Sequence, residues 1–149
     1  MEIQSTPRKQ LVVGFAFSED LLKVVLEEKD HPEEQAGKIN GPGGAREAID
    51  ISIAHAMSRE FQEECGVITD PDEWIHCAHV KKEHVDLDFF CARGDKFMQA
   101  RTMTSELIMI VPADLKSVIQ PFMDDVEEIV ALSLDILNKN TFTPSLEIK

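Results

Sequence analysis

Apolar residues occur along this chain in short runs and in one helical stripe, a pattern that predicts alternating strands and helices. Residues 11–17 (Leu-Val-Val-Gly-Phe-Ala-Phe) form a continuous apolar run of the kind found in buried strands. A polar turn at residues 18–20 separates this run from residues 21–26, which we expect to pair with it as a hairpin before the charged residues 27–30. Two prolines and four glycines in residues 31–44 then predict a loop.

Between residues 50 and 65 the apolar period changes to that of a helix. Ala54, Met57, Phe61 and Cys65 fall within roughly 80° of arc at 100° per residue, so they predict one buried stripe. Gly66 follows directly, at the position where a helix commonly ends on glycine.

The second half of the chain predicts three more strands and one more helix. Strand patterns cover residues 73–82, 85–93 and 106–111, and helical spacing covers residues 124–138. The length of 149 residues fits a single domain, 1–149, of mixed α and β class. We expect flexible ends at about residues 1–9 and 140–149.

The charge balance excludes some partners and favours others. The chain has 28 acidic residues against 15 Lys and Arg, a formal net charge of -13. Such a surface repels nucleic acid and anionic membranes, so we expect neither as a partner. An anionic small molecule would need local cations, which a protein this acidic would supply as bound divalent metal.

The cysteines and the apolar runs indicate a compartment. Cys65, Cys77 and Cys91 contain no C-x-x-C pair, which argues against a disulfide framework and a thiolate zinc site. No continuous apolar stretch is as long as the core of a signal peptide at the N-terminus or as a membrane span elsewhere. We therefore expect a cytoplasmic protein.

Three glutamates on the predicted helix carry the candidate chemistry. Glu60, Glu63 and Glu64 share one face at i, i+3 and i+4, where their like charges repel unless hard cations bind them. Arg59 lies four residues before Glu63 and could fix its rotamer by an ion pair. The glycine-rich residues 41–44 precede this helix and allow the backbone to approach a ligand closely.

The stretch from Gly44 to Val67 resembles the box of the Nudix hydrolase family. Its C-terminal half reads Arg-Glu-Phe-Gln-Glu-Glu-Cys-Gly-Val and matches the family pattern R-E-U-x-E-E-x-G-U without a gap, where U is apolar. Gly44 fits the box glycine. The first box acid, a glutamate in the family, falls at Asp50, which eight residues instead of seven separate from Arg59, and Glu47 competes for that role.

This resemblance implies a fold, an activity and a set of site residues. The fold would be a Nudix-like α/β/α sandwich with a mixed sheet between helices. The activity would be Mg²⁺-dependent (or Mn²⁺-dependent) hydrolysis of a nucleoside diphosphate linked to another moiety. The metal ligands would be Glu60, Glu64, Glu63 and Gly44, with Arg59 orienting Glu63; the general base would be Glu63 or, at the start of a late strand, Glu106.

Other polar residues have weaker assignments. Arg46, Gly43 and Lys38, in or near the glycine loop, are the substrate-binding candidates, and Arg8 and Lys9 are further possible phosphate clamps. His76 and His79 lie three apart on a predicted strand, which would place them on opposite faces and prevent chelation.

Three functions remain open on the sequence. The leading one is the hydrolase, acting on nucleotide sugars, ADP-ribose, dinucleoside polyphosphates or nucleoside triphosphates. The second is a non-catalytic nucleotide-binding or regulatory module that keeps the fold, and the third is an acidic cation buffer, which lacks calcium-loop spacing. The apolar stripe of the last helix would also allow a homodimer.

Overall fold

A mixed β-sheet forms the centre of the molecule. The computed structural model describes residues 8–147. The strands are β1 Lys9–Phe17, β2 Lys23–Glu28, β3 Ile39–Asn40, β4 Gly43–Ala45, β5 Ile75–Lys81, β6 Val85–Arg93 and β7 Leu107–Pro112. The helices are α1 Ile53–Cys65 and α2 Val126–Glu147, with short 3-10 turns η1 Glu33–Gln35, η2 Pro71–Glu73 and η3 Asp95–Gln99.

The strand order brings distant parts of the chain together. It runs β3-β2-β1-β6-β5, while β4 pairs with β1 and β7 pairs with β2. The pairing of β1 with β6 is parallel, and the other named pairs are antiparallel. The expected hairpin of β1 and β2 is confirmed at Ala16↔Val25 and Phe17↔Val24. The β2–β7 pairing places the start of β7 beside the end of β2.

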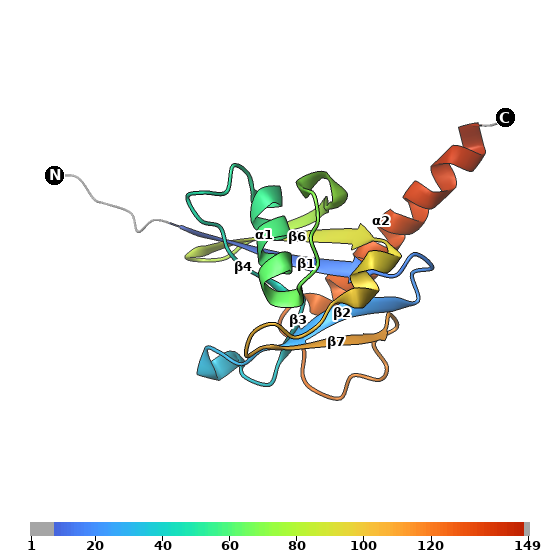
Figure 1. Cartoon of the computed structure of the whole chain (residues 1–149). Helices are drawn as coiled ribbons and strands as arrows, with labels where there is room; N and C mark the ends of the chain where they lie inside the picture. The colour runs from blue at the N-terminus through green and yellow to red at the C-terminus, as the bar shows by residue number, and fades with distance from the viewer. Residues whose placement is uncertain (1–7, 148–149) are drawn as a thin grey trace.

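The two faces of the sheet carry separate apolar cores. Along β1, Val12 and Ala16 pack in the core that includes α1, whereas Val13 and Phe15 pack in the core that includes α2. Successive side chains of a strand point to opposite faces, which accounts for this division. The sheet therefore lies between two helices (Figure 1), and the expected mixed α/β sandwich is confirmed.

Helix α1 ends where its sequence predicts, and it begins three residues later than the helical pattern that starts at residue 50. The Ser52 side chain accepts a hydrogen bond from the His55 backbone N–H at its start. Gly66 ends it in the left-handed region, at φ 75°, where glycine has no Cβ penalty. Met57, Phe61 and Cys65 are buried as expected, whereas Ala54, the fourth residue of the predicted stripe, is only partly buried.

The structure corrects two expected boundaries. The stretch 31–44 is not simply a loop, because it contains η1, β3 and most of β4. The last helix runs to Glu147 instead of ending near residue 138, and its C-terminal part projects from the sheet (Figure 1). Of the ends expected to be flexible, residues 1–7 and 148–149 lie outside the described residues.

Two further expectations concern cysteines and membranes. Cys65, Cys77 and Cys91 are all free thiols, as the absence of a disulfide framework predicted. Among the described residues, every helix is too short or too polar to cross a membrane.

Candidate active site

Arg59 connects helix α1 to the loop that leads into it. Its guanidinium donates from Nε to Asp50 Oδ1 (3.0 Å) and from Nη2 to Asp50 Oδ2 (2.9 Å) and the Ala45 carbonyl (3.0 Å). Its Nη1 donates to Glu60 (3.2 Å) and Glu63 (3.1 Å). The expected Arg59–Glu63 pair is present, but Asp50 is the principal partner.

Asp50, rather than Glu47, is the acid that holds Arg59 most closely. The Asp50 side chain is 4% exposed, whereas that of Glu47 is 62% exposed and lies 3.7 Å from Arg59. The hydrogen bond from Arg59 lowers the pKa of Asp50 below its ordinary value. Asp50 thus stays ionised and holds Arg59 in one orientation.

Glu60 lies against the backbone of the glycine loop. A Cβ added to Gly44 would come 2.5 Å from both Glu60 carboxylate oxygens, so only glycine leaves this carboxylate room. Burial raises the pKa of Glu60 to about 7, although Arg59 opposes the shift. Glu60 and Gly44, both predicted metal ligands, are therefore neighbours.

Glu64 is fixed from the same loop, one turn further along α1. Its Oε1 accepts a hydrogen bond from the Gly43 N–H at 3.1 Å. Gly43 pairs with Val13 of β1, so the sheet positions this donor. Burial raises the pKa of Glu64, although the Gly43 N–H and Lys29 oppose the shift.

Glu64 also belongs to a group of three carboxylates from distant elements. Ligand oxygens of Glu27 on β2, Glu64 on α1 and Glu106 before β7 all lie within 4.8 Å of one another. Glu27 is 1% exposed, and its Oε1 has no hydrogen-bond partner among residues 8–147. A buried oxygen without a donor, beside two other carboxylates, fits a divalent cation well.

Lys29 is the cation beside this group. Its Nζ lies 3.5 Å from Glu27 Oε2 and 3.2 Å from Glu106 Oε1. Burial lowers the pKa of Lys29, but Glu27 and Glu106 outweigh that effect and the net shift is upward. Glu106 Oε2 also accepts from the Asp30 N–H at 2.8 Å, so both of its oxygens are engaged.

The sequence interpretation missed Glu27 and Lys29. The charged pattern of residues 27–30 predicts the end of a strand, but Glu27 lies within β2, on its face toward α1, two residues after Val25. The signal in the sequence is the run Val24-Val25-Leu26. Its residues point alternately to the two faces of the strand and are all apolar, which indicates a strand buried on both faces. An acid that continues such a strand is buried.

The other predicted site residues lie in varied surroundings. The Glu63 side chain is 56% exposed, and Glu106, at 3% exposure, is not a surface acid. Arg46 donates to Gln10 and to the carbonyls of Asp50 and Ile51, which ties its guanidinium to the loop before α1. Lys38 is half-buried, and the contacts of Arg8 are with Asp86 and the β5–β6 turn.

The expectation for the two histidines is wrong. His76 Nε2 and His79 Nδ1 lie 2.7 and 2.8 Å from the same oxygen, Asp88 Oδ1. A bulge between His76 and Ala78 shifts the alternation of β5, so both rings reach one face.

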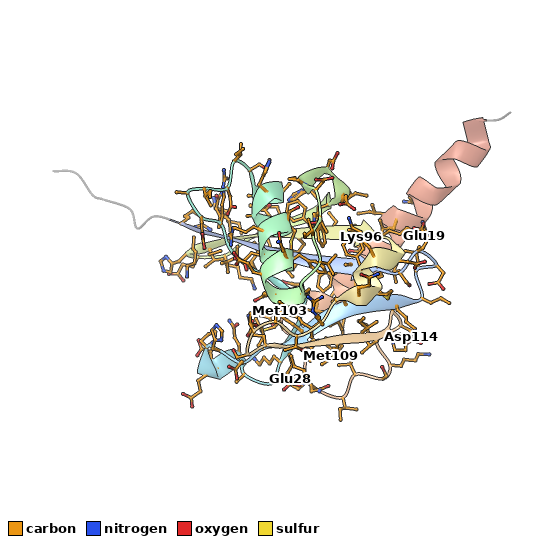
Figure 2. The ribbon with its side chains drawn as sticks, in the orientation of Figure 1. Glu19, Glu28, Lys96, Met103, Met109 and Asp114 are labelled. Carbon is orange, nitrogen blue, oxygen red and sulfur yellow. The ribbon has the colours of Figure 1, made fainter. Side chains whose placement is uncertain are left out.

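A pocket of about 490 Å³ opens on the other side of the glycine loop. Leu11, Val13, Leu87 and Phe89 form its apolar wall, and Asn40 and Gly44 also line it. Gly44 thus separates this pocket from the Glu60 carboxylate. At the end of the box helix, the Met103 N–H donates to the Glu64 carbonyl, and Figure 2 shows Met103 beside the C-terminal end of α1.

Comparison with solved structures identifies the architecture. The chain matches a MutT structure from work on Aliivibrio salmonicida and Vibrio cholerae, at 24% identity and TM-score 0.66, covering 83% of this chain and 96% of that one. It also matches the NUDIX domain of Shewanella oneidensis NrtR complexed with ADP ribose (17%, TM-score 0.73, 89% and 90% covered).

A MutT NUDIX hydrolase from Burkholderia pseudomallei is similar as well (17% identity, TM-score 0.67, 86% and 98% covered). The chain has the Nudix fold. No protein-family profile matches it, and no curated protein sequence does. In this Nudix fold, the box residues from Gly44 to Val67 form the loop and helix that carry Glu60 and Glu64.

Proposed function

We propose that this protein is a divalent-metal-dependent hydrolase of a nucleoside diphosphate derivative, and that it is a soluble cytoplasmic enzyme. The observation that carries the proposal is the position of Gly44, which separates an apolar pocket from the carboxylates of α1. A nucleotide needs an apolar site for its base and a cationic site for its phosphates, a short distance apart. The Nudix fold of the chain supports the same function.

The box carboxylates would hold the metal. Glu60 and Glu64 offer carboxylate oxygens on the face of α1 toward the glycine loop. The carbonyl oxygen of Gly44, in that loop, would be the third oxygen ligand. When bound there, Mg²⁺ would neutralise phosphate charge and make water easier to deprotonate. Arg59 limits the motion of Glu60 and Glu63 by its hydrogen bonds to both.

We assign the removal of the water proton to Glu63 rather than to Glu106. Glu63 is more than half exposed, so it can reach a water molecule beside bound substrate. Glu106 is buried, and its two oxygens accept from Lys29 and the Asp30 N–H. A general base needs access to the water that it deprotonates, which favours Glu63.

The nucleobase of the substrate would lie in the pocket of Leu11, Leu87 and Phe89, with Asn40 as a polar group that faces the edge of the nucleobase. Phe89 is a core residue, at 2% exposure, and lines the pocket only in part. The diphosphate would then lie over Gly43 and Gly44, where small residues allow close approach. Arg46 and Lys38 remain the proposed cations for the phosphates.

A substrate panel tests this function. Nucleoside triphosphates, ADP-ribose, nucleotide sugars and dinucleoside polyphosphates are each incubated with protein and Mg²⁺, and released phosphate, pyrophosphate and nucleoside monophosphate are measured. We expect turnover of at least one class, its loss in excess chelator, and a greatly reduced kcat in Glu63→Gln. Tight nucleotide binding without any turnover would instead favour the non-catalytic module.

A further inference from the structure

Glu27 occupies a position that normally costs a protein stability. Its side chain is 1% exposed, and its Oε1 has no hydrogen-bond partner in the part of the chain that the structure describes. A buried polar atom without a partner costs about 1–3 kcal/mol, and more if it is charged. Val25, two residues earlier on the same face, shows that an apolar residue fits this side of β2.

The charges around Glu27 leave a deficit that a divalent ion would balance. Glu27, Glu64 and Glu106 offer oxygens within 4.8 Å of one another, and the Lys29 ammonium contacts Glu27 and Glu106. When all three are ionised, three carboxylates facing one ammonium leave two negative charges, and without metal, burial and the neighbouring Glu64 raise the pKa of Glu27 well above its ordinary value. Lys29 approaches Glu27 from the side of Oε2, which leaves Oε1 as the atom without a donor.

The three carboxylates also come from elements that only the fold brings together. Glu27 lies on β2, Glu64 on α1 and Glu106 just before β7. Ligands on a strand and a helix are held more rigidly than ligands on loops, which suits an ion that needs several oxygens at fixed distances.

We propose that Glu27 is a direct ligand of a divalent cation, together with Glu64 and Glu106, on the β2 side of the box helix. This ion position is distinct from the Glu60–Gly44 side and shares Glu64 with it. The inference rests on the proposed function in that it extends the metal centre of the same site. It adds a ligand from outside the box, which the pattern of the box helix does not contain.

Binding of Mn²⁺ alone tests the proposal without any activity assay. The paramagnetic resonance signal of free Mn²⁺ counts unbound ion in titrations of wild type, Glu27→Gln and Glu27→Leu. Glu28→Gln is the matched control, since Glu28 (labelled in Figure 2) is the next residue of β2 and accepts from Gln120 rather than facing the cluster. We expect both Glu27 variants to lose one bound ion or to weaken its binding at least about tenfold, and the control to match wild type.

The Leu variant keeps the test valid if Glu27→Gln folds poorly, because it buries no polar group. A crystal of the wild type soaked in Mn²⁺ gives a second readout. An anomalous peak about 2.2 Å from a Glu27 oxygen supports the proposal. Unchanged Mn²⁺ binding in the Glu27 variants, or an ion that Glu27 does not touch, overturns it.

The outcomes separate this inference from the proposed function. If the Glu27 variants lose an ion but the wild type hydrolyses no nucleotide on the panel, the ligand assignment stands and the function fails. If the wild type is active while the Glu27 variants bind Mn²⁺ normally, the function stands and the ligand assignment fails. Loss of kcat with normal Mn²⁺ binding would make Glu27 a group that acts on substrate or water.

Discussion

Arg59 and Asp50 form a two-pronged ion pair across nine residues of sequence. Nε lies 3.0 Å from Oδ1 and Nη2 lies 2.9 Å from Oδ2, and the side chains are 19% and 4% exposed. Planar guanidinium and carboxylate groups match in this geometry, which fixes orientation as well as distance. Because the same guanidinium also contacts Glu60 and Glu63, the pair connects the loop before α1 to the carboxylates of the helix.

Replacing Arg59 with Ala should therefore impair both stability and catalysis. Asp50 would be left buried without its partner, and we expect a loss of about 2 kcal/mol in the free energy of unfolding, less than for a fully buried pair. Glu60 and Glu63 would lose a donor, so kcat should fall. Arg59→Lys keeps the charge without the two-pronged geometry, so its stability and its kcat should lie between those of wild type and Arg59→Ala. Urea unfolding and steady-state kinetics measure both effects; a normal kcat in Arg59→Ala would reduce Arg59 to a structural role.

The pair also predicts how stability changes with pH. Arg59 lowers the pKa of Asp50 below its model-peptide value of 3.8, so ionised Asp50 stabilises the folded state above about pH 4. That contribution is lost as the pH falls through the lowered folded pKa. Wild type should exceed Asp50→Asn in unfolding free energy at pH 7, and the difference should shrink in acid. Asp72→Asn, at an exposed position, is the control; a pH-independent difference for Asp50→Asn would contradict the prediction.

Adjacent glycines should respond differently to alanine. A Cβ at Gly43 would lie 1.9 Å from the Val12 carbonyl oxygen, so Gly43→Ala must displace strand backbone and should cost about 1–3 kcal/mol or more. A Cβ at Gly44 would meet the Glu60 carboxylate, the end of a side chain that can rotate away. Gly44→Ala should thus keep most of its stability but lose metal affinity and kcat. Calorimetry with and without Mg²⁺ distinguishes the two; equal destabilisation would refute the distinction.

Glu64→Gln tests whether the acidic cluster binds metal. Without metal, removing one of the crowded carboxylates should leave the melting temperature unchanged or slightly higher. The free energy of unfolding of wild type should increase with Mg²⁺, in proportion to the logarithm of the Mg²⁺ concentration divided by the dissociation constant. The variant should lose most of this increase and be inactive. Melting curves with Mg²⁺ and with chelator provide the measurement. The same Mg²⁺ shift and the same activity in both proteins would mean that Glu64 binds no metal.

Local patterns were sufficient for much of the fold. Residues 11–17 and 85–93 carry strand periodicity, Gly66 ends α1 where a left-handed residue is needed, and each lies where the sequence predicts. The pattern could not give the parallel pairing of β1 with β6, because those strands are separated by more than sixty residues and their order depends on packing. It also missed the bulge that turns His76 and His79 to one face, since a single extra residue reverses every later side chain.

For the candidate site, the amino-acid sequence by itself determined the helical carboxylates. Glu60, Glu63 and Glu64 follow from 3.6-residue periodicity, and Gly43 and Gly44 from their freedom to approach a ligand. Only the tertiary structure decided that Asp50 holds Arg59 and that Glu27 and Glu106 join Glu64. Their approach depends on the register of β2 with β7 and on the packing of α1 over the sheet. Whether a charged side chain on a strand is buried depends on which helix or strand packs over it, and the local sequence pattern does not contain that information.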